Sequence, residues 1–341
     1  MRALVKARPE VGLELIDRPQ PTPGPADVLI RVTRAAICGT DLHIYKWDDW
    51  ASSNMAPPVT IGHEFVGVVE AVGSQVGFIE VGTRVAGEGH ITCGRCRNCR
   101  AGDGHNCRNV IGVGIQRDGG FADYVVIPAV NAYPIPESLD DDIAAILDPL
   151  GNAVHTALSF DLVGEDVLIT GAGPIGQMAA AVCRHAGARH VVITDIEPAR
   201  LRTAEAMGAS CGVLAREGGL ADAMSSLSMT EGFDIALEMS GSNHAVTDIL
   251  EYTNHGGKVG LLGLFADTAD IDMNAAILKG LTIKGIYGRE MFDTWYKAVA
   301  MLNSGLSIEP IISHRVDIET YEDAFELLLA GNASKVVLEV S

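Results

Sequence analysis

Two short segments of the sequence carry side chains that can bind a metal ion and move a proton. In the first, a thiol (Cys38), a hydroxyl (Thr40) and an imidazole (His43) lie within six residues. The second adds another imidazole (His63) and a carboxylate (Glu64). A thiolate, an imidazole and a carboxylate suit a zinc ion that keeps one position open for a substrate. Each of these residues alone is more often structural, so this prediction depends on the rest of the chain.

Four of the seven cysteines lie close together, as Cys93, Cys96, Cys99 and Cys107. Four thiolates at this spacing can close a tetrahedral shell around zinc. Because a closed shell leaves no position for a substrate, we predict a structural zinc here. An iron–sulfur cluster and free thiols are the alternatives.

A nucleotide-binding fingerprint follows a short apolar strand at 167–170. Gly171, Gly173 and Gly176 fill a Gly-x-Gly-x-x-Gly pattern, and a helix is predicted from there to residue 186. Glycines at these positions permit a tight turn and let a pyrophosphate approach the N-terminus of the helix. The strand, the turn and the helix together predict dinucleotide binding.

The next predicted strand, at 191–195, ends in a carboxylate. Asp195 can bind both hydroxyls of a ribose and would repel a 2′-phosphate, which favours NAD over NADP. Arg200 weakens this argument, because an arginine can accept such a phosphate.

The predicted elements around these segments indicate two kinds of domain. In the first half, an alternating strand at 28–36 delivers Cys38 at its end, and glycine-punctuated β runs predict a compact, barrel-like β domain. The second half alternates strands with helices, which predicts a doubly wound α/β sheet. Its further strands are expected at 211–214, 233–239, 258–263 and 281–286, and its further helices at 197–207, 217–227 and 243–254.

The bulk composition narrows the class of protein. A chain of 341 residues is long enough for two domains. Its net charge of -19 argues against a nucleic-acid partner or an anionic membrane surface. The N-terminus lacks the apolar run of a signal peptide, and no stretch approaches the ~18 apolar residues of a membrane span, so we expect a cytoplasmic protein. In such a protein the clustered, odd-numbered cysteines favour metal over disulfides.

One further carboxylate stands in an apolar setting. Asp148 lies between Leu147 and Pro149. A buried carboxylate needs a partner, so Asp148 is either a local helix cap or a residue of the site.

The order of these features resembles the zinc-containing medium-chain dehydrogenase/reductase (alcohol dehydrogenase) family over essentially the whole chain. Four segments, at 36–45, 87–93, 148–156 and 284–290, resemble most closely the members that oxidise L-threonine. The resemblance implies a GroES-like β-rich catalytic domain at 1–150 with a zinc lobe at 88–110. It further implies a Rossmann domain at 151–290 and a return to the catalytic domain at 291–341.

The resemblance also implies an activity and its residues. We expect oxidation of L-threonine by NAD to 2-amino-3-ketobutyrate in a homotetramer with two zinc ions per chain. The catalytic zinc ligands fall on Cys38, His63 and Glu64, and the proton relay on Thr40 and His43. The NAD contacts fall on Ile175, Asp195, Arg200, Leu262, Gly263, Leu264, Ile286 and Tyr287.

One position departs from the wider family. Alcohol dehydrogenases often have a cysteine near position 148, and polyol dehydrogenases a glutamate. Asp148 is one methylene shorter than glutamate, so we expect it to act through a water or the relay rather than on zinc. A polyol or vicinal-diol dehydrogenase, and a non-catalytic redox sensor that binds zinc and nucleotide, remain the alternatives.

Overall fold

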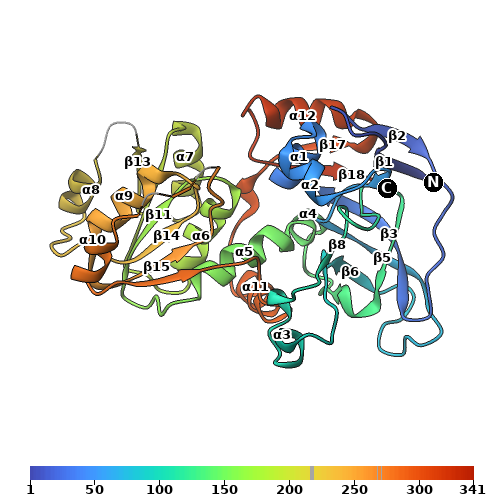
Figure 1. Ribbon diagram of the computed structural model, residues 1–341, viewed down its shortest axis with the longest axis horizontal. Helices are drawn as coiled ribbons and strands as arrows, with labels where there is room; N and C mark the ends of the chain where they lie inside the picture. The colour runs from blue at the N-terminus through green and yellow to red at the C-terminus, as the bar shows by residue number, and fades with distance from the viewer. Residues whose placement is uncertain (216–218, 267, 270) are drawn as a thin grey trace. The chain divides into compact units, whose positions relative to one another are not determined.

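The computed structural model describes residues 1–215, 219–266, 268–269 and 271–341 (Figure 1). The chain divides into two compact units. Unit 1 comprises Met1–Asp148 and Ile312–Ser341, and unit 2 comprises Pro149–Ile311. Within the described residues, the chain has no helix of the length and apolarity that crossing a membrane requires.

Unit 1 is rich in β-strands, as the alternating sequence predicts. Its main sheet has the order β10-β6-β5-β3-β18-β17, with β9 paired to β3. Two smaller sheets have the orders β2-β1-β4 and β7-β8. The strands are β1 (Arg2–Lys6), β2 (Glu14–Asp17), β3 (Asp27–Ala36), β4 (Val59–Thr60), β5 (Phe65–Val72), β6 (Arg84–Gly87), β7 (His90–Ile91), β8 (Ile111–Gly112), β9 (Tyr124–Pro128), β10 (Ala132–Pro134), β17 (Ile312–Asp317) and β18 (Lys335–Glu339).

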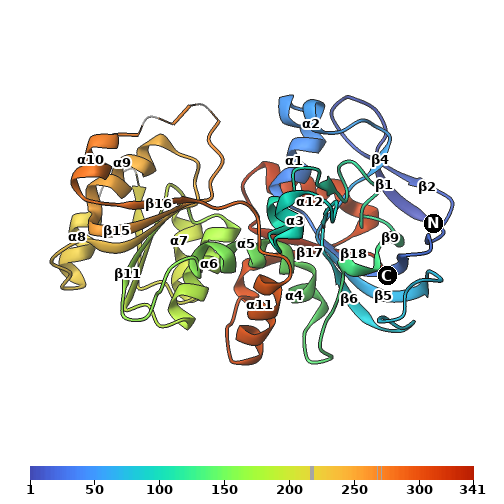
Figure 2. The same ribbon diagram turned by 60° about the horizontal axis from the view of Figure 1, so that its bottom comes forward.

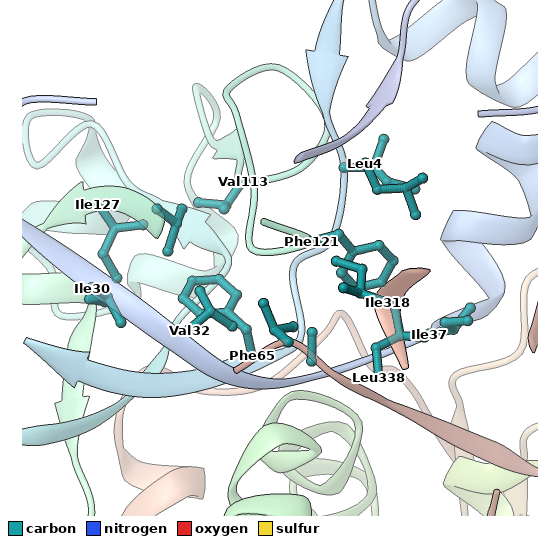
Figure 3. Close-up of a cluster of buried hydrophobic side chains, with 14 of the residues drawn as sticks. Leu4, Ile30, Val32, Ile37, Phe65, Val113, Phe121, Ile127, Ile318 and Leu338 are labelled. Carbon is teal, nitrogen blue, oxygen red and sulfur yellow. The ribbon is translucent and has the colours of Figure 1, made fainter. Parts of the chain in front are cut away.

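Short helices connect these strands. An apolar core includes side chains of β3 and β5, the strands that adjoin the metal-binding segments. The helices are α1 (Gly39–Lys46), α2 (Asp49–Asn54), α3 (Arg97–Arg100), α4 (Asp141–Ala145) and α12 (Tyr321–Leu329). Figure 3 shows Phe65, Phe121 and Leu338 gathered in the core with side chains from β3. Phe121 and Leu338 are fully buried and Phe65 is almost so, and this packing fixes the end of β3, from which Cys38 follows.

Unit 2 contains a six-stranded parallel sheet of order β13-β12-β11-β14-β15-β16. The chain runs outward in one direction from β11 to β13 and in the other from β14 to β16, so the order reverses between β11 and β14. This confirms the predicted doubly wound sheet, and Figures 1 and 2 show helices along both of its faces. In such a sheet the ligand binds at the carboxyl ends of the strands, where the order reverses.

The strands of unit 2 are β11 (Asp166–Thr170), β12 (His190–Asp195), β13 (Cys211–Leu214), β14 (Phe233–Glu238), β15 (Thr253–Leu261) and β16 (Thr282–Gly285). Its helices are α5 (Leu147–Ala157), which begins at the boundary between the units, α6 (Pro174–His185), α7 (Pro198–Ala206), α8 (Leu220–Ser226), α9 (Asn243–Tyr252), α10 (Met273–Leu278) and α11 (Asp293–Asn303). The start of the helix expected at 217–227 lies outside the described residues.

The return of the chain to the first unit comes later than the boundary at residue 290 that the sequence suggested. Residues 291–311, including α11, belong to unit 2. The reason is packing: Trp295 on α11 is 1% exposed and its ring lies under the guanidinium of Arg289. A Cβ at Gly151 would lie 2.9 Å from the same ring, so α11 packs tightly against α5. Of the residues after 290, only the strands β17 and β18 join the main sheet of unit 1.

Candidate active site

The three predicted ligands of a catalytic metal lie together in unit 1. Cys38 follows β3 and is the N-cap residue of α1, where its backbone N–H donates to the carboxylate of Asp41 at 2.8 Å. The backbone N–H of Ala36 donates to the carbonyl of Glu64 at 2.9 Å, which ties the two ligand segments to each other. As a result, one ligand atom each from Cys38, His63 and Glu64 lie within 4.8 Å of one another.

The charges around His63 favour a bound cation. His63 Nδ1 lies 3.8 Å from Asp41 Oδ1, and within the described part of the chain neither atom has a hydrogen-bond partner. Burial lowers the pKa of His63, but the carboxylate of Asp41, the thiol of Cys38 and the carboxylate of Asp148 outweigh it and raise the pKa to about 10. A thiol, an imidazole and a carboxylate clustered beside further buried acidic groups fit a bound cation, and the residue types are those of a zinc site.

A buried lysine balances one of these negative charges. Lys335 begins β18 and is 3% exposed, and its Nζ lies 2.9 Å and 2.6 Å from the two carboxylate oxygens of Glu64. The same Nζ donates to the carbonyl of Ile37 at 3.1 Å. Burial raises the pKa of Glu64, and the ammonium of Lys335 opposes that rise. Burial lowers the pKa of Lys335, but the neighbouring carboxylate of Glu64 outweighs it, so the net shift of the Lys335 pKa is upward.

The remaining predicted catalytic residues lie around this cluster. The hydroxyl of Thr40 is 3.9 Å from Cys38 Sγ, and His43 is on the same helix, three residues later. Asp148 is 7% exposed at the start of α5. Its carboxylate influences the pKa values of both His63 and Glu64, but it is not one of the three residues whose ligand atoms cluster.

The four cysteines of the predicted structural site also come together. Their sulfurs all lie within 4.8 Å of one another, and Cys96 Sγ is 3.4 Å from Cys99 Sγ. Zinc–sulfur bonds of about 2.3 Å in a tetrahedron place the sulfurs at similar separations. A backbone N–H of Arg95 lowers the pKa of Cys93 to about 6, whereas burial and the neighbouring thiols raise that of Cys99 to about 12. Four cysteine sulfurs gathered in this way fit a bound cation, which would favour the thiolate form of each.

A pocket of about 590 Å³ lies in unit 2 at the carboxyl ends of the strands. Gly171, Gly173, Asp195 and Arg200, all singled out in the sequence, line it. Of the fingerprint glycines, Gly176 is required by close contact, because a Cβ there would lie 1.9 Å from the carbonyl oxygen of Gly171. Gly171 itself has a φ of 94°, a conformation that favours glycine. The pocket has the shape and position of a dinucleotide site.

The carboxylate of Asp195 is held in place at this pocket. Its Oδ2 accepts the backbone N–H of Ala172 at 2.7 Å, and its Oδ1 accepts that of Glu197 at 2.9 Å. Arg200 Nη1 lies 3.7 Å from the same Oδ1, so the arginine faces a carboxylate rather than an open anion site.

The other predicted nucleotide contacts do not line this pocket; Ile175 lies in α6, and the rest lie in loops at the same edge of the sheet. The backbone N–H groups of Leu262 and Gly263 donate to the carbonyl of Glu238, and the N–H of Ile286 donates to that of Leu261. Ile175 lies with Gly176 in the first turn of α6. Leu264 is 90% exposed and Tyr287 is 54% exposed.

Sequence reasoning missed several residues of these sites. Glu238 is fully buried, and its Oε1 accepts the hydroxyl and N–H of Ser240 and the N–H of Gly241, which shapes one wall of the pocket. The sequence signal for Glu238 was a carboxylate at the end of a predicted strand of the nucleotide-binding sheet. A lone lysine at the start of the apolar strand β18 was the signal for Lys335, and the spacing Cys38-x-x-Asp41 was the signal for a cap.

Comparison with known proteins agrees with this geometry. Residues 24–137 match the family model "Alcohol dehydrogenase GroES-like domain", and residues 174–304 match "Zinc-binding dehydrogenase". L-threonine 3-dehydrogenase of Aeromonas salmonicida is 58% identical over 338 residues, which are 99% of each chain. The enzyme of the same name from Deinococcus radiodurans is 57% identical over 99% of this chain and 98% of its own.

This chain belongs to the L-threonine 3-dehydrogenase family of zinc-containing alcohol dehydrogenases. Solved structures of the wider group have the same fold. An alcohol dehydrogenase of E. coli CFT073, complexed with NADH, superposes with a TM-score of 0.91 at 27% identity, over 100% of this chain and 99% of its own. The alcohol dehydrogenase of Thermus sp. ATN1 does so with a TM-score of 0.88 at 30% identity over all of both chains. The family membership confirms the expected zinc and nicotinamide cofactors.

Proposed function

We propose that this chain oxidises L-threonine to 2-amino-3-ketobutyrate and reduces NAD, as an enzyme of threonine degradation. The observation that carries the proposal is the full-length identity of 58% to a named L-threonine 3-dehydrogenase. The clustering of Cys38, His63 and Glu64 supplies the site for the chemistry. A redox sensor without catalysis would have no use for a metal set that keeps one position open.

The metal set determines how the substrate is activated. Zinc held by Cys38, His63 and Glu64 would supply Lewis acidity that lowers the pKa of the threonine hydroxyl, while NAD accepts the hydride. Lys335 holds Glu64 in place by binding both of its oxygens. His63 would hold the metal through a ring nitrogen, and the carboxylate of Asp41, 3.8 Å from Nδ1, would help to orient the imidazole.

The hydroxyl proton leaves through α1. Thr40 lies beside Cys38, and its hydroxyl can accept a proton and pass one on. His43 is 54% exposed on the same helix, so it can exchange that proton with water. Asp148 is placed to act on His63 and Glu64 through its charge or a water, in agreement with a role outside the metal shell.

Three features of unit 2 support NAD as the cofactor. Gly171, Gly173 and Gly176 admit the pyrophosphate at the N-terminus of α6. The fixed carboxylate of Asp195 can bind the ribose hydroxyls, and it also neutralises Arg200, so a 2′-phosphate would find little attraction there.

The proposal includes a homotetramer in the cytoplasm. In the isolated chain, the edge strand β16 is exposed at all of its residues, Thr282–Gly285, and an uncovered edge strand is a natural place for another copy to pair. None of the seven cysteines, all of which lie in the described residues, forms a disulfide, which fits a reducing compartment.

The direct test is NADH formation from L-threonine by the purified, zinc-loaded protein, with sorbitol and 2,3-butanediol as competing substrates. We expect turnover with L-threonine to exceed that with either diol. Preference for a diol would assign the chain to the polyol group, and absence of turnover with every alcohol would leave a binding role. Light scattering of the same sample tests the tetramer.

A further inference from the structure

The proton acceptor His43 has a partner of its own, supplied by the residue that begins the next helix. Nδ1 of His43 lies 2.5 Å from Oδ2 of Asp48. The contact depends on a sharp reversal of the chain, in which Trp47 ends α1 with a φ of 54° and a ψ of 48°. This left-handed conformation is costly for a residue other than glycine, so other contacts must stabilise it.

Lys6 and α1 supply those contacts. The Nζ of Lys6 lies 5.1 Å from the centroid of the Trp47 ring and donates to carbonyls that include that of Gly12 at 3.0 Å. The N–H of Trp47 itself donates to the carbonyl of Ile44. The contacts of Lys6 and of the Trp47 N–H therefore stabilise the reversal. The reversal brings Asp48 next to His43, five residues earlier in the chain.

Asp48 is also fixed at its other oxygen. Its Oδ1 accepts the backbone N–H of Ala51 at 3.1 Å, so Asp48 is the N-cap of α2. The ring of Trp50, in the first turn of α2, lies 6.0 Å from that of His43 between centroids. The hydrogen bond to His43 lowers the pKa of Asp48, so the carboxylate is ionised. One short helix thus presents a fixed anion and an aromatic ring to the imidazole.

We propose that Asp48 is a positioning residue that orients His43 and fixes its tautomer for proton transfer. A carboxylate accepts only, so neutral His43 must carry its proton on Nδ1 and donate it to Asp48. Nε2 then presents a lone pair, accepts the proton from the relay and forms an imidazolium paired with Asp48. Release of that Nε2 proton to water restores the neutral ring. This inference rests on the proposed function, in which His43 takes the proton.

Asp48→Asn tests the orientation without removing the cap, because asparagine is an equally good N-cap residue. If the amide oxygen keeps the bond from Ala51, the amide nitrogen faces His43 Nδ1 and donates to it. The imidazole proton then moves to Nε2, which can no longer act as a base. If the amide flips, its nitrogen faces the N–H of Ala51 and the cap is lost, which the unfolding midpoint would report.

The matched control is Asp49→Asn, which removes the same charge from the exposed neighbouring position in the first turn of α2. Turnover is followed at steady state and in a single turnover, so that slow product release does not hide the proton step. For Asp48→Asn we expect kcat to fall by at least about tenfold. This loss should be smaller than the ~10²–10⁴-fold rate enhancement that a general base contributes. We expect KM for NAD, zinc content and the unfolding midpoint to stay unchanged, and Asp49→Asn to match the wild type.

The double variant of Asp48→Asn with His43→Asn separates the positioning role of Asp48 from the relay role of His43. If Asp48 acts through His43, Asp48→Asn causes no further loss in the His43→Asn background. A loss that multiplies with that of His43→Asn, or a loss equal to that of Asp49→Asn, would overturn the positioning role while the relay stands. Wild-type turnover in His43→Asn alone would overturn the relay itself and, with it, the role given to Asp48.

Discussion

Replacement of Lys335 by methionine tests the charge balance of the metal site. The ammonium of Lys335 makes three contacts, two with the carboxylate of Glu64 and one with the carbonyl of Ile37. The side chains of Lys335 and Glu64 are 3% and 0% exposed. Methionine fills a similar volume, so the substitution removes the cation and leaves Glu64 buried without its partner.

The expected cost follows from this burial. Removing one partner of a buried ion pair costs about 3–5 kcal/mol, because the other charge stays desolvated. Glu64 can lose its charge by binding a proton. For a carboxyl that has its ordinary pKa in the unfolded chain, this protonation costs about 2 kcal/mol at pH 6 and about 5 kcal/mol at pH 8. Burial raises the pKa of Glu64 and Lys335 opposes that rise, so without Lys335 the folded chain holds a proton on Glu64 more tightly than the unfolded chain does. Stability is therefore lost as the pH rises.

Urea unfolding of the metal-free protein between pH 6 and pH 8 measures the effect. For Lys335→Met we expect a free energy of unfolding that is about 2 kcal/mol lower than that of the wild type at pH 6 and 4–5 kcal/mol lower at pH 8. Saturating zinc should reduce the difference, because a bound cation compensates the same carboxylate.

Lys297→Met is the matched control. Lys297 pairs with Asp293 on the surface of α11, where the two side chains are 43% and 52% exposed. Such a pair contributes about 0–1 kcal/mol. If Lys335→Met costs no more than this control, and equally at both pH values, Glu64 does not depend on Lys335 and the reasoning is refuted.

Two further predictions concern the cofactor pocket and the cysteine lobe. Gly176→Ala should abolish NADH binding and lower stability, since the new Cβ would lie 1.9 Å from the backbone oxygen of Gly171. Gly173→Ala should weaken NADH binding without lowering stability, because a Cβ there would meet no atom within 4 Å. Fluorescence titration with NADH and thermal unfolding distinguish the two, and equal stability would contradict the assigned clash. Cys99→Ser should remove one of two zinc ions per chain and lower the unfolding midpoint. Iron and a visible chromophore in the wild type would instead indicate a cluster.

Local patterns in the sequence were sufficient for much of the fold and of the site. The doubly wound sheet follows from alternating buried strands and helices, because a parallel sheet requires a crossover helix between strands. Cys38, His63 and Glu64 were recognisable because metal ligands have few possible chemistries and these three are close in the chain. The fingerprint glycines were recognisable because Gly176 lies against Gly171, five residues away.

Other features were decided by tertiary structure alone. Lys335 and Glu64 are 271 residues apart, and only the pairing of β18 with β3 brings them together. The pairing of Asp48 with His43 depends on a left-handed Trp47, which no local propensity predicts.

The sequence by itself thus predicted which residues are candidates to bind the metal and the nucleotide, since the chemistry of those ligands restricts the residue types. Tertiary structure decided which charges balance and orient those atoms. The reason is physical. A buried charge can be balanced by any group of opposite charge within hydrogen-bond distance. When that group comes from a strand far away in the sequence, no short-range sequence pattern indicates the pair.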